Sequence, residues 1–226
     1  MVVKATKLEG IHTLADLHKR LGYVPLHRIL FDPVPGTATE SDAVRLLEAA
    51  GKQLVELIDG VLVEKPMGQE ESRMGLYLGG LLLSYCDDHD LGWVSGADAA
   101  SKMRQGNIRL PDISVYPWAM FPEGEMPDEA VASVCPWLGV EVLSDSNTEA
   151  EIALKLREFF ASGMRLAWII DPATRTAKVH SGPKRFRLLD EDSSLEGGSV
   201  VPGFSCTLKS IFEKGLRQPR RPKRTP

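Results

Sequence analysis

The feature that most constrains this chain is a strand–helix–strand unit at residues 137–171, which opens with WLGVEVL and ends with RLAWIID. Thr148, followed three residues later by Glu151, forms a capping-box pattern that predicts a helix start. Gly163 suits the end of that helix, at about residue 162. An apolar strand, a helix of this length and a second apolar strand predict a right-handed parallel crossover within one sheet.

Glu141 is the exception in the first of these strands, because the other residues of the run 137–143 are apolar or glycine. An unpaired carboxylate in a sheet core costs roughly several kcal/mol. Strand alternation places Val140 and Val142 on one face and Glu141 with Leu143 on the other. The sequence therefore predicts a positively charged partner for Glu141 and leaves the identity of that partner open.

A second strand contains the same kind of exception. In RLPDISVY, Ile113 and Val115 share one face, and Asp112 begins the strand on the opposite face. Two neighbouring strands that each deliver an acid to one face would form a dicarboxylate site for Mg²⁺, which favours one or two carboxylates with waters and a phosphate. In the alternative reading Asp112 caps a turn and Glu141 meets an arginine, such as Arg109 or Arg165. The pattern alone does not separate these readings.

Lys155 lies on the predicted helix, at the edge of its buried stripe of Ile152, Leu156, Phe159 and Phe160. A lysine at such an edge commonly runs along apolar surface and keeps its ammonium in water. This helix directly follows the Glu141 strand, however, so the ammonium could reach the acidic site. There it would act as a charge clamp or as an activator of water.

The rest of the chain divides into three parts. Residues 1–50 predict an N-terminal helical extension, residues 51–214 the main domain, and residues 215–226 a disordered basic tail rich in proline. Asp59-Gly60 between two apolar runs predicts a hairpin. The further expected elements are a helix at 70–89, strands within 93–104 and 108–117 joined at a 105–107 turn, a long loop at 117–136, additional antiparallel strands at 176–204 and a closing helix near 207–214.

Composition narrows the class of protein. The net charge of −4 gives no general attraction to nucleic acid, so binding would need a local basic patch. Three separated cysteines without a CxxC pair favour the cytoplasm and argue against a cysteine zinc site. No apolar run approaches the ~18 residues of a membrane span, and the N-terminus does not read as a signal peptide, so no membrane partner is expected. The five histidines show no ligand spacing.

Five segments together resemble the PD-(D/E)XK nuclease superfamily, and within it the Uma-two family of bacterial restriction endonucleases. The carriers are ELIDGVLVEKPMG, RLPDISV, GVEVLSDSN, KLREFFASGMRLAWIIDP and VVPGF, and the resemblance extends from about residue 38 to 214. The resemblance implies an α/β (α+β) fold with a restriction-endonuclease-like αβββαβ core and a mixed sheet. The N-terminal helices and C-terminal antiparallel strands would be additions to that core.

The resemblance also implies roles for particular residues. Asp112 would be the first metal-binding acid and Glu141 the second, holding magnesium or manganese. The superfamily commonly has a lysine two residues after the second acid, where this chain has Leu143; in this branch the lysine is expected on the following helix, which matches Lys155. Glu71 stands where many relatives carry a histidine at the start of the first core helix, and would be a third metal-binding and catalytic acid. Glu56 is an additional candidate.

The expected function is that of a metal-dependent endonuclease that hydrolyses phosphodiester bonds of nucleic acid, with DNA as the expected substrate and a homodimer as the expected assembly. Lys102, Arg104 and Arg109 around the 105–107 turn are candidate contacts to the substrate backbone, since phosphate contacts dominate affinity. In the alternative interpretation, these three residues lie on a solvent-exposed hairpin tip and contact no substrate.

A rival interpretation is a non-catalytic protein that keeps the nuclease fold for binding or oligomerisation, because fold alone does not decide function. The net negative charge of the chain favours the non-catalytic interpretation, whereas the presence of Asp112, Glu141 and Lys155 favours the interpretation as an enzyme. The sequence contains no GxSxG, P-loop or HExxH motif of another hydrolase class.

Overall fold

The computed structural model describes residues 8, 10–66, 68–121 and 129–215. Its central layer is a sheet of six strands: β3 (Gly92–Ser95), β6 (Ile113–Pro117), β8 (Leu138–Val142), β9 (Leu166–Asp171), β10 (Thr176–His180) and β11 (Phe186–Leu189). Their order across the sheet is β11-β10-β9-β8-β6-β3. β8 and β9 run parallel and the other neighbours antiparallel, so the sheet is mixed as predicted.

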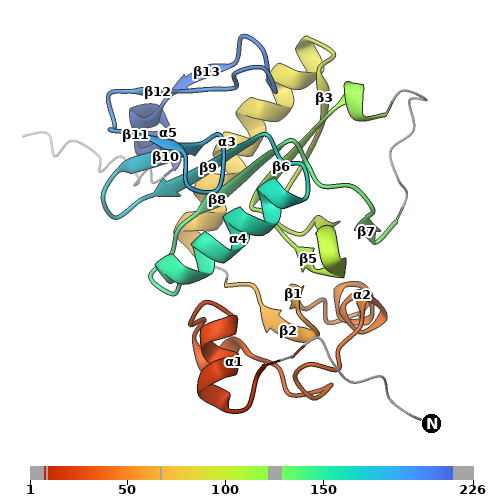
Figure 1. Ribbon diagram of the computed structural model, residues 1–226. Coiled ribbons are helices and arrows are strands. Elements are labelled where there is room, and N and C mark those ends of the chain that lie inside the picture. Colours follow the sequence, from red (N-terminus) through yellow and green to blue (C-terminus); the bar gives the residue numbers. More distant parts are fainter. Residues whose placement is uncertain (1–7, 9, 67, 122–128, 216–226) are drawn as a thin grey trace, which may run out of the picture.

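Two helices cover the faces of this sheet, α3 (Gln69–Asp88) behind it and α4 (Glu149–Ala161) in front (Figure 1). Val140 and Trp168 pack in one core with Met74 of α3. Ala167 and Phe159 belong to a separate core on the α4 side. Along the chain, α3, β3, β6, β8, α4 and β9 therefore form the predicted αβββαβ order.

A second, five-stranded sheet lies beside the first. It contains β1 (Val55–Ile58), β2 (Val61–Glu64), β4 (Ala100–Lys102), β5 (Ile108–Arg109) and β7 (Val131–Ala132), in the order β2-β1-β5-β4-β7. The β1–β2 turn confirms the predicted hairpin, since Asp59 (φ 48°) and Gly60 (φ 78°) both have the positive φ that a type I′ turn requires.

The extents predicted for the strands at 93–104 and 108–117 are wrong, because each stretch divides between the two sheets. The first stretch breaks at a turn in which Ala99 N–H donates to Gly96 C=O at 3.1 Å. The second breaks at Pro111, which has no N–H to continue a ladder. Asp112 N–H then donates to Val140 C=O at 2.9 Å and begins the pairing with β8. The 105–107 turn is the β4–β5 connection, η2 (Arg104–Gly106).

The N-terminal segment contains α1 (Leu14–Arg20), η1 (Leu26–Arg28) and α2 (Glu40–Glu48). Its apolar side chains share cores with the hairpin, as Leu21 does with Val61 and Leu47 with Val55. Arg28 makes a buried ion pair with Glu151 of α4, Nη2 to Oε1 at 2.8 Å. The segment is thus joined to both the hairpin and α4.

The C-terminal part adds β12 (Ser194–Glu196), β13 (Ser205–Thr207) and α5 (Leu208–Gly215), and η3 (Trp118–Met120) follows β6. Ile211 and Phe212 of α5 pack into the core on the α3 side of the six-stranded sheet. The antiparallel strands β10–β13 confirm the additions predicted after the core. The predicted basic tail, apart from Gly215, lies outside the described residues. Within the described part of the chain, no helix combines the length and apolarity of a membrane span.

Candidate active site

Asp112 and Glu141 meet at the boundary between β6 and β8. Ile113 pairs with Val140, so extending this antiparallel register by one residue places Asp112 opposite Glu141. The Val142 N–H donates to Asp112 Oδ2 at 2.7 Å, which fixes the orientation of that carboxylate. Both acids line one pocket of about 200 Å³ at this end of the sheet.

Lys155 enters the same pocket from α4. Its ammonium donates to Glu141 Oε2 at 3.0 Å and to Glu141 Oε1 at 3.1 Å. The residue is 2% exposed, so it does not run outward along the helix surface. The positive charge that meets Glu141 is therefore Lys155. Of the two arginine alternatives, Arg165 stacks on the Trp137 ring instead.

Glu56 of β1 is the second partner of Lys155, with Oε1 at 3.1 Å from Nζ. Its other oxygen accepts from Arg109 Nη1 at 2.8 Å, and Arg109 Nε donates to Glu158 Oε2 at 2.6 Å. A buried chain of alternating charges thus runs from Glu141 through Lys155, Glu56 and Arg109 to Glu158. Glu56, only an additional candidate from sequence, is its central acid.

The expectation that Arg109 contacts substrate from a surface turn is wrong. The side chain is fully buried and pairs with two carboxylates. Of the other two candidates, Lys102 pairs with Glu40, and the Arg104 guanidinium donates to Ala161 C=O at 3.5 Å. Neither lines the pocket that holds Asp112.

The two carboxylates that share Lys155 differ in their pKa values. Burial raises the pKa of Glu141, Lys155 lowers it and Asp112 raises it again, to about 7 overall. Burial also opposes ionisation of Glu56, but Lys155 and Arg109 outweigh it and lower the pKa of that carboxyl to about 2. The difference follows from the partners, because Glu56 pairs directly with two cations, whereas Glu141 pairs directly with Lys155 and lies near the negative Asp112.

Lys65, just after β2, is a pocket residue that the sequence reading missed. Its ammonium lies 2.8 Å from Asp112 Oδ1 and donates to Ala97 C=O at 3.1 Å. It is 8% exposed. Strand alternation could have predicted this position, because side chains two residues apart share a face of a strand and Lys65 follows Val61 and Val63 at that spacing.

Glu71 lines the pocket from the first turn of α3. A β-carbon built on Gly68 would fall 1.7 Å from Glu71 Oε2, so the glycine leaves room for this carboxylate at the helix start. Within the described residues, however, no group of three or more His, Cys, Asp or Glu side chains is placed to hold a metal together. Glu71 therefore does not complete a three-acid cluster with Asp112 and Glu141.

The donor set nevertheless fits a hard divalent cation. Asp112 and Glu141 offer carboxylate oxygens only, and the pocket also contains Ser144 and Asn147. Mg²⁺ accepts one or two carboxylates and completes its shell with waters and substrate oxygens. Asp112 raises the pKa of Glu141, so the two acids are close enough to repel, and a cation between them would remove that repulsion.

Comparison with known proteins agrees with this fold. A family model for Uma2, described as "Putative restriction endonuclease", matches residues 42–209. A crystal structure described as "a putative nuclease belonging to DUF820 from Anabaena variabilis ATCC 29413" superposes with a TM-score of 0.64. The two chains are 21% identical, and the match covers 72% of this chain and 91% of the other. This similarity is one of fold.

No curated protein matches the chain. Because the family model spans most of its length, the chain belongs to the Uma2 family of restriction-endonuclease-like proteins.

Proposed function

We propose that the protein is a metal-dependent endonuclease that hydrolyses phosphodiester bonds of nucleic acid, with DNA as its substrate. The observation that carries this proposal is the pair Asp112 and Glu141, opposed on adjacent strands in one pocket, with the Lys155 ammonium bound to Glu141. Membership of the Uma2 family supports the same reaction class.

In this proposal Asp112 and Glu141 hold a Mg²⁺ or Mn²⁺ ion, which would supply Lewis-acid activation of the phosphodiester and of the attacking water. The Val142 N–H holds Asp112 in place, and Lys155 holds Glu141. Two ammonium groups, Lys65 and Lys155, balance the negative charge that increases at phosphorus during attack.

Lys155 contributes through charge in this scheme and not as a base. Burial opposes its protonation, but Glu141 and Glu56 outweigh burial and raise the pKa of Lys155 above its ordinary value. An ammonium held in this way keeps its proton near neutral pH, so it cannot take one from water. Its contribution is to orient Glu141 and to stabilise developing negative charge.

Cleavage of plasmid DNA, single-stranded DNA and RNA, with Mg²⁺ or Mn²⁺ and with EDTA, tests the proposal. We expect metal-dependent cleavage of DNA that falls by roughly 10²-fold or more in Asp112→Asn and in Glu141→Gln, the scale of losing electrostatic help in catalysis. Exposed Lys184→Ala serves as the matched control and keeps full activity.

Calorimetric titration with Mn²⁺ separates the enzyme from its rival. A protein that binds Mn²⁺ through Asp112 yet cleaves none of the substrates would support the non-catalytic alternative. Cleavage that survives Asp112→Asn would contradict the assignment of the site.

A further inference from the structure

The reaction centre receives one of its charged groups from the five-stranded sheet. Glu56 lies on β1 of that sheet, whereas Glu141 lies on β8 of the six-stranded sheet. Glu56 is 1% exposed, and its Oε1 lies 3.1 Å from Lys155 Nζ. It does not line the pocket that contains Asp112 and Glu141. Glu56 therefore acts on that pocket from behind Lys155 and is not placed as a metal ligand itself.

The Glu56 carboxylate is held in place by its own sheet. β1 and β5 pair antiparallel at Leu57 and Ile108. Extended by one residue, this register places Glu56 opposite Arg109. Arg109 Nη1 donates to Glu56 Oε2 at 2.8 Å, and the Leu110 N–H donates to Oε1 at 3.2 Å. Both donors are buried, so the carboxylate is fixed from two sides.

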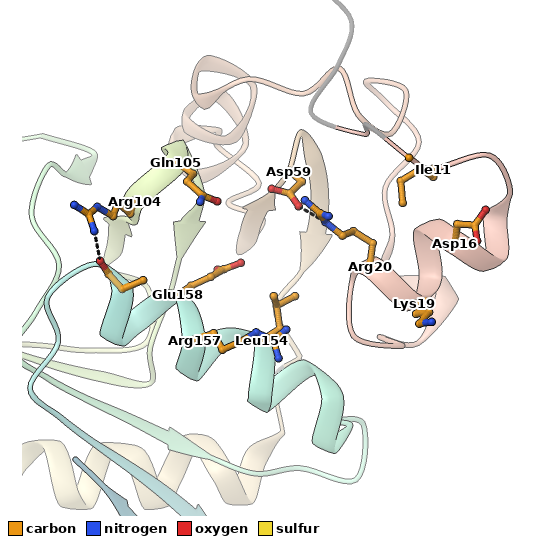
Figure 2. Close-up of a pocket in the computed structure, with 12 residues that line it drawn as sticks. Ile11, Asp16, Lys19, Arg20, Asp59, Arg104, Gln105, Leu154, Arg157 and Glu158 are labelled. Atoms are coloured by element: carbon orange, nitrogen blue, oxygen red, sulfur yellow. Dashed lines mark hydrogen bonds and ion pairs between the residues drawn. The ribbon is translucent and has the colours of Figure 1, made fainter. Parts of the chain in front are cut away.

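Arg109 does not fully neutralise Glu56, because it is shared with a second carboxylate. Its Nε donates to Glu158 Oε2 at 2.6 Å. Glu158 projects from α4 and also lines a surface pocket beside that helix (Figure 2). Two carboxylates thus hold one guanidinium, and Glu56 keeps negative charge for Lys155. Glu56 remains ionised at neutral pH, since its pKa is about 2.

Lys155 is bound in such a way that a cation at Glu141 must compete with it. Its ammonium donates to both Glu141 oxygens, at 3.0 and 3.1 Å, and the residue is 2% exposed. Glu71 and Asp98 line the same pocket, but neither lies within ion-pair distance of Lys155. Among the described residues, only Glu141 and Glu56 do so. A cation that drew the Glu141 oxygens away would leave a buried ammonium unpaired, which is costly, unless a second acid held it. Glu56 is that acid.

We propose that Glu56 is a positioning residue for the metal site. It keeps Lys155 paired when Glu141 directs its oxygens to a divalent cation, so the cation and the ammonium can occupy the pocket together. This role rests on the proposed function, because it concerns the same cation. It also makes the β1–β2 hairpin part of the reaction centre, since Glu56 comes from β1.

Calorimetric titration of Mn²⁺ into wild type and Glu56→Gln tests this role. Glutamine keeps the size of the side chain and an oxygen for the Leu110 N–H, but it removes the charge that faces Lys155. We expect Mn²⁺ to bind Glu56→Gln roughly 10–100-fold more weakly, the scale of losing a residue that supports a metal ligand. Glu196→Gln removes an exposed acid of β12, and this control leaves the affinity unchanged.

A double-mutant cycle separates action through Lys155 from a general loss of structure. In the Lys155→Met background there is no ammonium to hold, so Glu56→Gln should no longer weaken Mn²⁺ binding. The same loss of affinity in both backgrounds would show that Glu56 does not act through Lys155, and would overturn the proposal.

Glu158→Gln provides a second test at a side chain that is 15% exposed and thus less critical for folding. Within the described residues, Arg109 then has Glu56 as its one carboxylate and draws it away from Lys155. Mn²⁺ binding should weaken in the same direction as in Glu56→Gln, by a smaller factor. Circular dichroism in EDTA checks that each variant is folded.

The outcomes distinguish this role from the proposed function. Mn²⁺ binding does not require cleavage, so an inactive protein that binds Mn²⁺ still tests Glu56. Wild type that binds no Mn²⁺ overturns the metal site and the role of Glu56 together. Wild type that binds Mn²⁺, with the same affinity in Glu56→Gln, overturns the role of Glu56 alone. If Glu56→Gln does not fold, unchanged affinity in Glu158→Gln overturns it.

Discussion

At the scale of single residues, the site is governed by one lysine shared between two buried carboxylates. Glu56 also has Arg109, whereas Glu141 depends on Lys155 and lies beside the negative Asp112. One carboxylate is thereby held ionised, and the other titrates close to neutral pH. Strongly perturbed pKa values of this kind are concentrated at functional sites.

The raised pKa of Glu141 predicts a pH dependence of stability. Between its ordinary value of 4.5 and about 7, the folded state keeps a proton that the unfolded state releases, so stability falls as pH rises through this window. Urea unfolding of wild type and Glu141→Gln in EDTA checks this prediction: the stability of wild type relative to the variant should decrease as pH rises from 4.5 to 7. Parallel curves from pH 4.5 to 7 would contradict it.

Removal of the Lys155 charge should destabilise the protein. Lys155→Met leaves Glu56 and Glu141 facing each other without the shared ammonium, and breaking a buried ion pair costs about 3–5 kcal/mol. Urea midpoints measure the loss. Adding Glu141→Gln to Lys155→Met should recover part of it, with a coupling of about 0.5–3 kcal/mol. Exposed Lys184→Met is the control, and strict additivity would argue against the shared-lysine arrangement.

At the scale of elements, the start of α4 is positioned by the N-terminal segment as well as by its own cap. Thr148 accepts from Glu151 N–H at 3.0 Å, which is one half of the predicted capping box; the Glu151 carboxylate pairs with Arg28 instead of the Thr148 N–H. Gly22, just after α1, approaches α4 so closely that a β-carbon there would lie 2.7 Å from the Glu151 backbone. The close approach of these two backbones aligns the helix that carries Lys155.

Gly22→Ala should therefore be more costly than an ordinary glycine substitution. It combines a positive φ of 76° with a clash against backbone, which cannot move aside as a flexible side chain can. Gly198→Ala is a matched control, since Gly198 also has positive φ (57°) but no atom within 4 Å of the added carbon. The control should lose about 1 kcal/mol and Gly22→Ala clearly more, by urea unfolding. Equal losses would mean that the contact does not matter.

At the scale of the whole molecule, the N-terminal segment and the nuclease-like core depend on each other. The segment covers apolar residues of the hairpin, including Ile58 and Val61, and supplies Arg28 to the buried Glu151. The boundary drawn from sequence at residue 50 therefore crosses continuous packing. A pocket lined in part by Lys19 and Arg20 of α1 also lies along this junction.

A chain that begins at residue 51 should consequently be much less stable than the full chain. It loses the apolar packing of the segment on the hairpin together with the Arg28–Glu151 ion pair. Thermal unfolding measures the effect. Arg28→Met in the full chain isolates the ion pair, because it leaves Glu151 buried without its cation, and should cost about 3–5 kcal/mol. Arg20→Ala removes a half-exposed pair and should cost less than about 1 kcal/mol. A truncated chain with the melting temperature of the full one would contradict this interdependence.

The sequence by itself determined the features that depend on neighbours a few residues apart. Alternation in β8 assigned Glu141 to the face opposite Val140, Thr148 and Glu151 predicted the start of α4, and Asp59-Gly60 predicted the hairpin. Each of these predictions depends on residues that are one to three positions apart, so it can be made from the amino-acid sequence without knowledge of the tertiary structure.

Apart from Lys155 and Glu141, which the sequence placed close together, tertiary structure alone decided which charges meet. Arg109 reaches Glu56 across 53 positions of sequence and Arg28 reaches Glu151 across 123, so no local pattern records either pair. Because residues 93–117 divide between two sheets, Arg109 is buried in the interior and not exposed at a surface turn as expected. Lys65 and Asp112 likewise meet only because the two sheets lie side by side. Buried ion pairs are selected by the three-dimensional arrangement that excludes water around them, and that arrangement exists only once the sheets have packed.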